Sequence, residues 1–491
     1  MILPYFIIVP LLASFLITLI GGKKDMWAIS LSFIAIVAVM VLSVFCFISY
    51  SSQTLVYEMS GWKLPFGIVL VMDAFTSFML FMVSIISFTS LIFSVQYIRH
   101  IGTDWRYYAL FMLLVTGMNG VIATGDLFNL FVFLEIALLA AFALVAFGGK
   151  AEEFEASFKY AVMGGVSSSF ILVAIAIIYS ATSTLTMAKI AEELKNVNPS
   201  VTLWVGGLLL AGFGLKAAIM PFHAWLPDAH SSAPAPISAM LSGILIKALG
   251  VYAIIRVFFN VFDAPIFFTN LFLVLGSISI LIGVFLAIGQ WDFKRLLAYH
   301  SISQVGYMLL GIGLATPLGI LGGVYHMFNH AIFKSLLFYN AGSVEVALGT
   351  RDLQKMGNVT KILPTTANTS MIASLSISGI PPFNGFFSKL IIIIAAVQAN
   401  EFWFAFIAVA GSILTLASFM KVQRYGFRGS TIIESLKEKI GWRMNSAMII
   451  LAVLCLLSSL LVIPGIREYT LDPVVNAIMQ KAQYMNLMAG R

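Results

Sequence analysis

The sequence predicts an all-α, polytopic membrane protein, and three observations support this fold class. Hydrophobic residues make up 60% of the 491 residues and charged residues only 10%, whereas a soluble domain carries about 25% charged residues. The mean hydropathy is +1.00. The apolar residues form continuous segments of about 20 residues, the length of a helix that spans the hydrocarbon of a bilayer. Strands of a membrane barrel would instead alternate over about ten residues.

Fourteen apolar segments are predicted to be transmembrane helices. In chain order they cover residues 2–20, 26–50, 66–97, 107–124, 126–147, 157–181, 202–220, 234–258, 266–289, 293–312, 316–345, 365–398, 402–422 and 446–464. The third, eleventh and twelfth are longer than a bilayer requires, so we expect them to tilt, break or protrude. No basic leader precedes the first segment and another segment follows it closely, so we expect no cleaved signal peptide.

The basic residues predict the orientation of these helices. The net charge is +7, and most lysines and arginines fall in the odd-numbered connections, those after the first, third and fifth helices and so on. Among them are Lys23, Lys24, Arg99, Arg106, Lys294, Arg295, Arg351 and Lys355. Because basic loops stay in the cytoplasm, we expect a protein of the cell inner membrane with both termini outside. The basic excess is then a matter of topology and does not indicate nucleic-acid binding.

Several kinds of chemistry have no motif in this chain. Cys46 and Cys455 both lie in apolar segments, and an iron–sulfur cluster needs about four thiolates. There is no Walker A loop, no glycine-rich dinucleotide fingerprint and no serine elbow. We therefore expect no catalytic redox site and no cofactor within this chain.

Two proline-rich interruptions occur beside lysines in apolar segments. Lys216 is followed by Pro221 and by the proline-containing stretch from His223 to Met240. The second interruption, SISGIPPFNGFFSK, covers Ser376–Lys389. Non-helical backbone at membrane depth is tolerated only where protein or water surrounds it, so both places are predicted to line a site.

The two interruptions also suggest an internal repeat. Lys216 belongs to the seventh predicted helix and Lys389 to the twelfth, an odd number of helices apart, so two five-helix units would have opposite orientations. We therefore expect N-terminal helices in 1–104, a first repeat in 105–260, an inverted second repeat in 261–425, and a last helix and tail in 426–491. Corresponding breaks in two halves of a transporter mark a central site.

Ionisable residues within the apolar segments are the candidate site. A lysine at the bilayer centre costs about 2.5–3.5 kcal/mol on insertion scales, so it needs a partner, water or a function. Burial favours the neutral amine, and a nearby carboxylate favours the charged one. Glu135 is the predicted counter-ion of Lys216, the alternative being a neutral carboxyl bonded within the bundle. Lys247 is a further candidate, or else an amine held by backbone carbonyls.

The eleventh segment carries a row of titratable groups. His326, His330 and Lys334 recur at four-residue spacing and so share one helix face. Histidine titrates near neutral pH, which suits a proton relay. A polar structural network is the alternative. Two histidines four apart can also bind zinc, but no intervening glutamate or third ligand accompanies them, so we predict no metal site. His300 is a relay candidate beside Ser301, Ser303 and Gln304.

The polar residues near the first interruption are harder to interpret. His223, Asp228 and His230 are predicted either to provide ion access or coupling, or to be bonded structural groups. Asp73 is expected to be a pairing site or a helix-capping site near one membrane face.

Four motifs resemble a known family. They are HAWLPDAHSSAPAPISAMLSG (223–243), KRLLAYHSISQVGYM (294–308), HAIFKSLLFYNAGSV (330–344) and SISGIPPFNGFFSK (376–389). These motifs are similar to those of the antiporter-like subunits of respiratory complex I, Mrp-type cation/proton antiporters, and membrane-bound [NiFe]-hydrogenase and sulfane-reductase complexes. The resemblance extends from about Trp105 to Arg424.

The resemblance implies fourteen helices, inverted five-helix repeats, and broken seventh and twelfth helices. It places the family's fifth-helix glutamate at Glu135, its seventh-helix lysine at Lys216, its bridging eighth-helix residue at Lys247 and its twelfth-helix residue at Lys389. The eleventh-helix positions match His326, His330 and Lys334. His300 stands where many relatives carry a small hydroxyl residue. The short segment after the last helix implies that the long lateral arm of complex I's most distal subunit is absent.

The sequence leaves four functions open. The first is a proton- or Na⁺/H⁺-translocating subunit of an energy-converting redox complex, with other membrane subunits and a peripheral arm that carries iron–sulfur clusters and, in the hydrogenase type, nickel–iron. The sequences of two motifs, HAIFKSLLFYNAGSV and GIPPFNGFFSK, favour this function. The second is the D-type subunit of a Mrp Na⁺/H⁺ antiporter. The third is a structural subunit that no longer pumps, and a stand-alone transporter is a further alternative.

Overall fold

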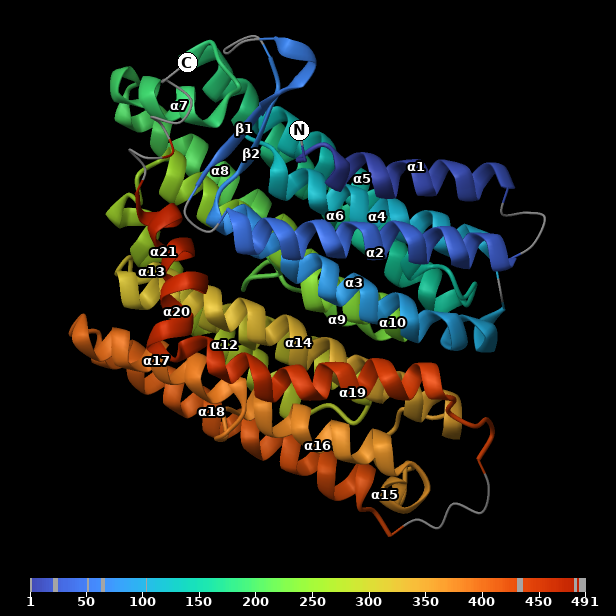
Figure 1. Cartoon of the computed structure of the whole chain (residues 1–491). Coiled ribbons are helices and arrows are strands. Elements are labelled where there is room, and N and C mark those ends of the chain that lie inside the picture. Colours follow the sequence, from blue (N-terminus) through green and yellow to red (C-terminus); the bar gives the residue numbers. More distant parts are fainter. Residues whose placement is uncertain are drawn as a thin grey trace.

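The computed structural model describes residues 2–20, 25–50, 53–62, 67–102, 104–430, 436–480 and 484. Lys23 and Lys24, two of the residues used to predict the orientation, lie outside the described residues. Helices dominate the described part of the chain, and Figure 1 shows the long ones lying side by side in one elongated bundle.

The first half of the chain forms helices at the predicted apolar segments, and two short helices between them. They are α1 (Tyr5–Ile20), α2 (Asp25–Ser49), α3 (Ala74–Ile101), α4 (Trp105–Ala123), α5 (Leu127–Val145), α6 (Ala151–Thr182), α7 (Met187–Glu193), α8 (Pro199–Ala217), α9 (Trp225–Ser232) and α10 (Ala235–Met240). The two short helices between the predicted segments are α7 and α9. The helix that α10 begins continues through π-helical turns and α11 (Tyr252–Ile255) to Val261.

The second half continues the pattern. Its helices are α12 (Ile266–Ile288), α13 (Phe293–Gly313), α14 (Pro317–Leu348), α15 (Val359–Ile362), α16 (Pro364–Ser378), α17 (Asn384–Gln398), α18 (Phe402–Lys421), α19 (Trp442–Leu457), α20 (Pro464–Thr470) and α21 (Asp472–Met479). Within the described residues, ten helices are long and apolar enough to cross a membrane. The chain is therefore a polytopic helical membrane protein, as predicted.

The third predicted helix, 66–97, begins later than expected. Val69–Met72 forms strand β2, which pairs antiparallel with β1 (Leu55–Glu58) in the register Leu55↔Met72. The strand sequence VLVM is apolar and partly β-branched, so it merges with the helical segment in a hydropathy pattern but also suits a strand. The helix starts only at Ala74, where the Asp73 carboxylate caps it by accepting a 2.7 Å hydrogen bond from the Thr76 N–H.

The bundle has two ends that differ in composition. The hairpin face carries β1, β2, α7 and α21, which Figure 1 shows on the same side of the bundle. The basic face is the opposite end, where α3 ends, α4 begins and α14 meets α15. It carries Arg99, Arg106, Lys150, Arg295 and Arg351. α14 remains one helix of 32 residues, so it accommodates its excess length without a break.

Two helices are interrupted at the predicted places. α8 ends at Ala217, and the chain resumes as α9 at Trp225. α16 ends at Ser378, and α17 starts at Asn384. Each first half ends on a left-handed residue, Ala218 with φ 54° and Gly379 with φ 79°. A left-handed residue commonly terminates a helix because it turns the chain away from the helical ladder.

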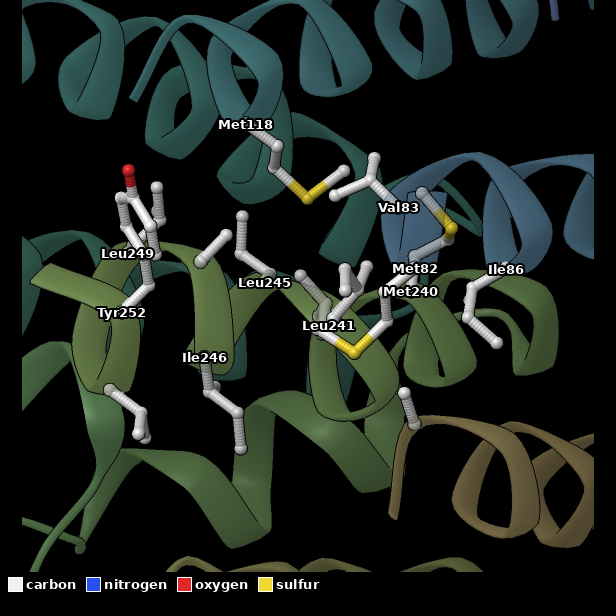
Figure 2. Close-up of a cluster of buried hydrophobic side chains, with 14 of the residues drawn as sticks. Met82, Val83, Ile86, Met118, Met240, Leu241, Leu245, Ile246, Leu249 and Tyr252 are labelled. Atoms are coloured by element: carbon white, nitrogen blue, oxygen red, sulfur yellow. The ribbon is translucent and has the colours of Figure 1, made fainter. Parts of the chain in front are cut away.

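The helix from Ala235 to Val261 occupies the middle of the bundle, and all of its residues are buried. It contains the π-helical segments Leu241–Leu245, Lys247–Val251 and Arg256–Val261. Such segments are rare and are frequently found at functional sites. Its apolar side packs on α3 and α4. Figure 2 shows Leu241, Leu245 and Met240 of this helix beside Val83 of α3 and Met118 of α4. This packing fixes the helix that carries Lys247.

A buried ion pair lies near the hairpin face. The Arg256 guanidinium donates hydrogen bonds of 2.6 and 2.9 Å to the two carboxylate oxygens of Asp73, and both side chains are almost completely buried. The guanidinium also lies 5.3 Å from the centre of the Tyr484 ring. Asn260 donates to the Ala477 and Ile478 carbonyls. The pair thus ties the cap of α3 to the central helix, which in turn holds α21.

Candidate functional site

Lys216 and Glu135 are linked through a serine of α6. The Lys216 ammonium donates hydrogen bonds to the Ser168 hydroxyl at 3.1 Å and to the Gly164 carbonyl at 2.9 Å. The Ser168 hydroxyl in turn donates to the Glu135 carboxylate. Lys216 is only 3% exposed, whereas Glu135 is half-buried on α5. The predicted pairing is therefore indirect, with one hydroxyl between the two charges.

Lys247 and Lys334 are joined by a second set of hydroxyl and carbonyl groups. Lys247 donates to the carbonyl of Ser242, five residues earlier in the helix. The Ser242 and Ser301 hydroxyls are hydrogen-bonded at 2.6 Å. The Ser301 hydroxyl also donates to the Leu297 carbonyl at 3.1 Å, and Lys334 donates to the same carbonyl. Both lysines are completely buried.

Lys389 lies beside the second interruption and next to His326. Its ammonium donates to the Ile377 carbonyl at 2.8 Å and lies 4.5 Å from the centre of the Tyr307 ring. The adjacent Ser388 hydroxyl is 3.0 Å from Nδ1 of His326. Nε2 of His326 is 3.2 Å from the Gln304 side-chain oxygen. α14, α13 and α17 thus bring the eleventh-segment histidine to the second interruption.

Three other histidines are buried with incomplete hydrogen bonding. Both ring nitrogens of His230 and of His330 lack a hydrogen-bond partner among the described residues, as does Nδ1 of His300. Nε2 of His300 contacts the Ser418 hydroxyl at 2.8 Å. The His330 ring centre lies 6.4 Å from that of His326. Buried polar atoms normally have a hydrogen-bond partner in the protein or in ordered water. An ordered water molecule beside each of these rings would supply the missing partner.

His223 and Asp228 differ from His230 in their surroundings. His223 is on the surface of the interruption, 3.2 Å from the Pro221 carbonyl. Asp228 accepts hydrogen bonds from Arg295 at 2.8 Å and Lys159 at 3.0 Å. Burial opposes its ionisation, but these two cations hold the pKa of Asp228 below its usual value. Asp228 is therefore an ionised member of a charged cluster on the basic face.

That cluster also contains residues that the sequence did not single out as a site. The Glu345 carboxylate lies 3.5 Å from Lys294 and 3.7 Å from Arg351 and accepts a 3.1 Å hydrogen bond from Tyr97. Lys294 was counted among the loop residues from the charge pattern, but α13 starts at Phe293 and includes it. The Lys294 side chain is buried, and its ammonium donates a 2.7 Å hydrogen bond to the Ala233 carbonyl. Cavities of about 240 and 320 Å³ open beside the cluster.

The structure therefore brings the predicted lysines and Glu135 into three groups, with Asp228 in a separate charged cluster on the basic face. The groups centre on Lys216, on Lys247 with Lys334, and on Lys389 with His326. The serine hydroxyls within these groups, those of Ser168 and Ser242 among them, were not predicted. Ser301 and Gln304 are polar neighbours of His300 in the sequence, but they contact Ser242 and His326 instead.

Together the fold and these groups define a polytopic helical membrane protein with a series of ionisable side chains through its interior. Residues 124–415 match the model of the family described as "NADH:quinone oxidoreductase/Mrp antiporter, TM". The chain belongs to this family, which confirms the resemblance stated from the motifs, and it is an antiporter-like membrane subunit.

Relatives come from different kinds of complexes. The chain is 38% identical to the D-type subunit of the Na(+)/H(+) antiporter of Alkalihalophilus pseudofirmus, over 86% of this chain and 87% of that protein. It is 37% identical to the N-type subunit of the NADH-quinone oxidoreductase of Desulforudis audaxviator, over 74% of each chain. A chain in the structure of an archaeal membrane-bound sulfane sulfur reductase superimposes with a TM-score of 0.91 at 30% identity, covering 98% of this chain and 99% of that one.

Proposed function

We propose that this subunit transfers protons, or exchanges protons for Na⁺, along the series from Glu135 to Lys389. The observation that carries the proposal is the set of four buried lysines with serine hydroxyls beside them. Ser168 links Lys216 to Glu135, and the hydrogen-bonded Ser242 and Ser301 hydroxyls lie between the carbonyls that bind Lys247 and Lys334. Each lysine at membrane depth is costly, and hydroxyls, which both donate and accept hydrogen bonds, are suited to passing protons between such groups. A structural role alone does not explain four such lysines on different helices.

In this scheme Lys216 is a proton carrier that Glu135 controls. When the Glu135 carboxylate is close, through Ser168, it stabilises the ammonium form of Lys216. When the carboxylate withdraws, desolvation favours the neutral amine, and the proton moves toward Lys247. From there Ser242 and Ser301 lead to Lys334, and His330 and His326 lead to Lys389. Water beside the unpartnered histidines completes the steps that side chains do not bridge.

The basic face is proposed to be cytoplasmic, with both termini outside in the inner membrane. The positive-inside rule supports this orientation. The fourteen predicted crossings and the division into 105–260 and 261–425 as inverted repeats belong to the same proposal. The inverted orientation of the two repeats is supported by the directions of the two interrupted helices. α8 runs from the hairpin face toward the basic face, and α16 runs in the opposite direction. The Asp228–Glu345 cluster, with His223 and His230 nearby, then provides access from the cytoplasm.

The chain is proposed to work with other membrane subunits that supply the driving force. The motifs favour a redox complex whose peripheral arm carries iron–sulfur clusters and, in the hydrogenase type, nickel–iron. The identity to a D-type component of an Na⁺/H⁺ antiporter supports a Mrp-type complex as the second candidate. Purification of the native complex distinguishes them: iron in stoichiometric amounts, with nickel in the hydrogenase type, supports the redox complex, and a complex of membrane subunits without iron supports the antiporter.

Replacing Ser168 by alanine tests the link between Glu135 and Lys216. A hydrogen bond to a charged group contributes about 1.5–3 kcal/mol, so we expect S168A to lower the rate of proton transfer about tenfold or more. The rate is measured as fluorescence quenching of a pH-sensitive dye in inverted membrane vesicles, driven by the donor or by Na⁺. Ser169 is the matched control, because its hydroxyl is exposed and donates only to the Gly165 carbonyl among the described residues. Equal rates in S168A and S169A would contradict the role of Ser168.

The Ser242–Ser301 contact is tested in the same vesicles. We expect S242A/S301A to slow proton transfer about tenfold, since the two hydroxyls form the only side-chain connection described between Lys247 and Lys334. The control is S303A, whose hydroxyl donates to the Ile280 carbonyl at 3.0 Å and lies outside the series. Wild-type flux in the double variant would remove this segment from the proposed path.

A further inference from the structure

A groove on the outside of the bundle lies between α16 and α18, away from the lysine series. Its volume is about 300 Å³. Met371 and Leu375 line it from α16, and Leu416, Phe419 and Met420 line it from α18. It runs from the basic face to Ser378, the last residue of α16 before the interruption.

The interior of the groove offers an occupant mainly apolar surface. Its polar side chains are satisfied within the protein, because the Gln423 amide donates to the Ser370 and Ser374 hydroxyls at 3.1 and 3.0 Å. The Ser378 hydroxyl donates to the Ser374 carbonyl at 2.7 Å. The surface that remains for an occupant is thioether, aliphatic and aromatic, which suits a hydrocarbon chain.

The mouth of the groove is positively charged. Arg424 and Arg428 lie at its basic-face end and both are exposed. Neither guanidinium forms a salt bridge with any described residue, and no acidic side chain in the described part of the chain lines the groove. Guanidinium groups bind phosphate through paired hydrogen bonds. Basic pockets between transmembrane helices on the cytoplasmic side bind anionic lipid head groups.

We propose that the α16–α18 groove binds one anionic phospholipid, with its phosphate on Arg424 and Arg428 and an acyl chain against Leu375 and Met420. The acyl chain extends to Ser378, whose neighbour Ile377 provides the carbonyl that holds Lys389. The lipid therefore also excludes water from this side of the second interruption. The inference rests on the groove alone and stands whether or not the lysine series carries protons.

Native mass spectrometry of the purified complex tests the site directly, with phosphatidylglycerol and phosphatidylcholine as the probes. We expect one phosphatidylglycerol to be retained at least about tenfold more than phosphatidylcholine. R424Q/R428Q should abolish this preference. L375W, which fills the groove and keeps both arginines, should displace the lipid. K355Q/K361Q is the matched control, because it removes two exposed charges at the same face outside the groove.

The outcomes separate lipid from other occupants. Unchanged retention of phosphatidylglycerol in R424Q/R428Q and in L375W would overturn the proposal. So would cross-linking of a cysteine introduced by M420C to another protein subunit of the complex, since that subunit would then cover the groove. Displacement of the bound lipid by inorganic phosphate alone would also contradict it, because the acyl chain is proposed to contribute to binding.

Discussion

Replacing Lys216 by alanine is expected to abolish ion translocation while the complex still assembles. The ammonium is the group that the Ser168 hydroxyl connects to Glu135, and no other lysine among the described residues is hydrogen-bonded to this pair. Alanine removes the proton acceptor. Because a buried amine at membrane depth costs free energy, we expect its removal to leave the fold stable. The expected rate in the vesicle assay is that of vesicles without the subunit.

The alternative of a structural subunit predicts the reverse for the same variant. Normal transport in K216A, or a loss of assembled complex with normal transport per remaining complex, would contradict the role of Lys216. K421A is a suitable control. The Lys421 ammonium binds the Ile288 and Gln290 carbonyls at 2.6 and 2.5 Å near the end of α18, so its loss should leave transport unchanged.

Replacing Arg256 by alanine is expected to destabilise the protein strongly. Removing one partner of a buried ion pair leaves the other charge uncompensated and costs about 3–5 kcal/mol. In this protein the remaining charge is Asp73, which also caps α3, and the contact of Arg256 with Tyr484 is lost as well. We expect R256A to lower the yield of assembled complex and its unfolding temperature, measured by size-exclusion chromatography after heating.

A double variant distinguishes the uncompensated charge from the loss of packing. D73N/R256M removes both charges and keeps side chains of similar size, so it should be more stable than R256A. If the double variant were less stable than R256A, the attraction within the buried pair would be the main source of stability, and the uncompensated Asp73 charge would not explain the effect of R256A.

The sequence predicted the helices well because each is specified locally by a continuous apolar segment. The strand Val69–Met72 was missed because four apolar residues beside an apolar helix do not change the hydropathy pattern. Its assignment depends on pairing with Leu55–Glu58, which is a tertiary contact. The interruptions at Pro221 and Gly379 were predicted, since proline and glycine act on the backbone locally.

Only the charged residues of the candidate site could be predicted from the sequence. A lysine in an apolar helix is conspicuous, but a serine is not, because in helices its hydroxyl often bonds a carbonyl of the preceding turn. Ser168 makes such a bond to the Gly164 carbonyl and also contacts Glu135 and Lys216. The Asp73–Arg256 pair is separated by 183 positions, and no sequence pattern indicates a contact over that separation.

The central claim is that Lys216 and Lys389 belong to one continuous path, and a comparison of single and double variants tests it most directly. Proton flux is measured in vesicles containing equal amounts of assembled K216A, K389A and K216A/K389A complexes. Groups that act as a unit have non-additive effects, so we expect each single variant to lose all flux and the double variant to lose no more. About half of the wild-type flux in either single variant, falling to zero only in the double, would show two independent paths and contradict a single continuous one.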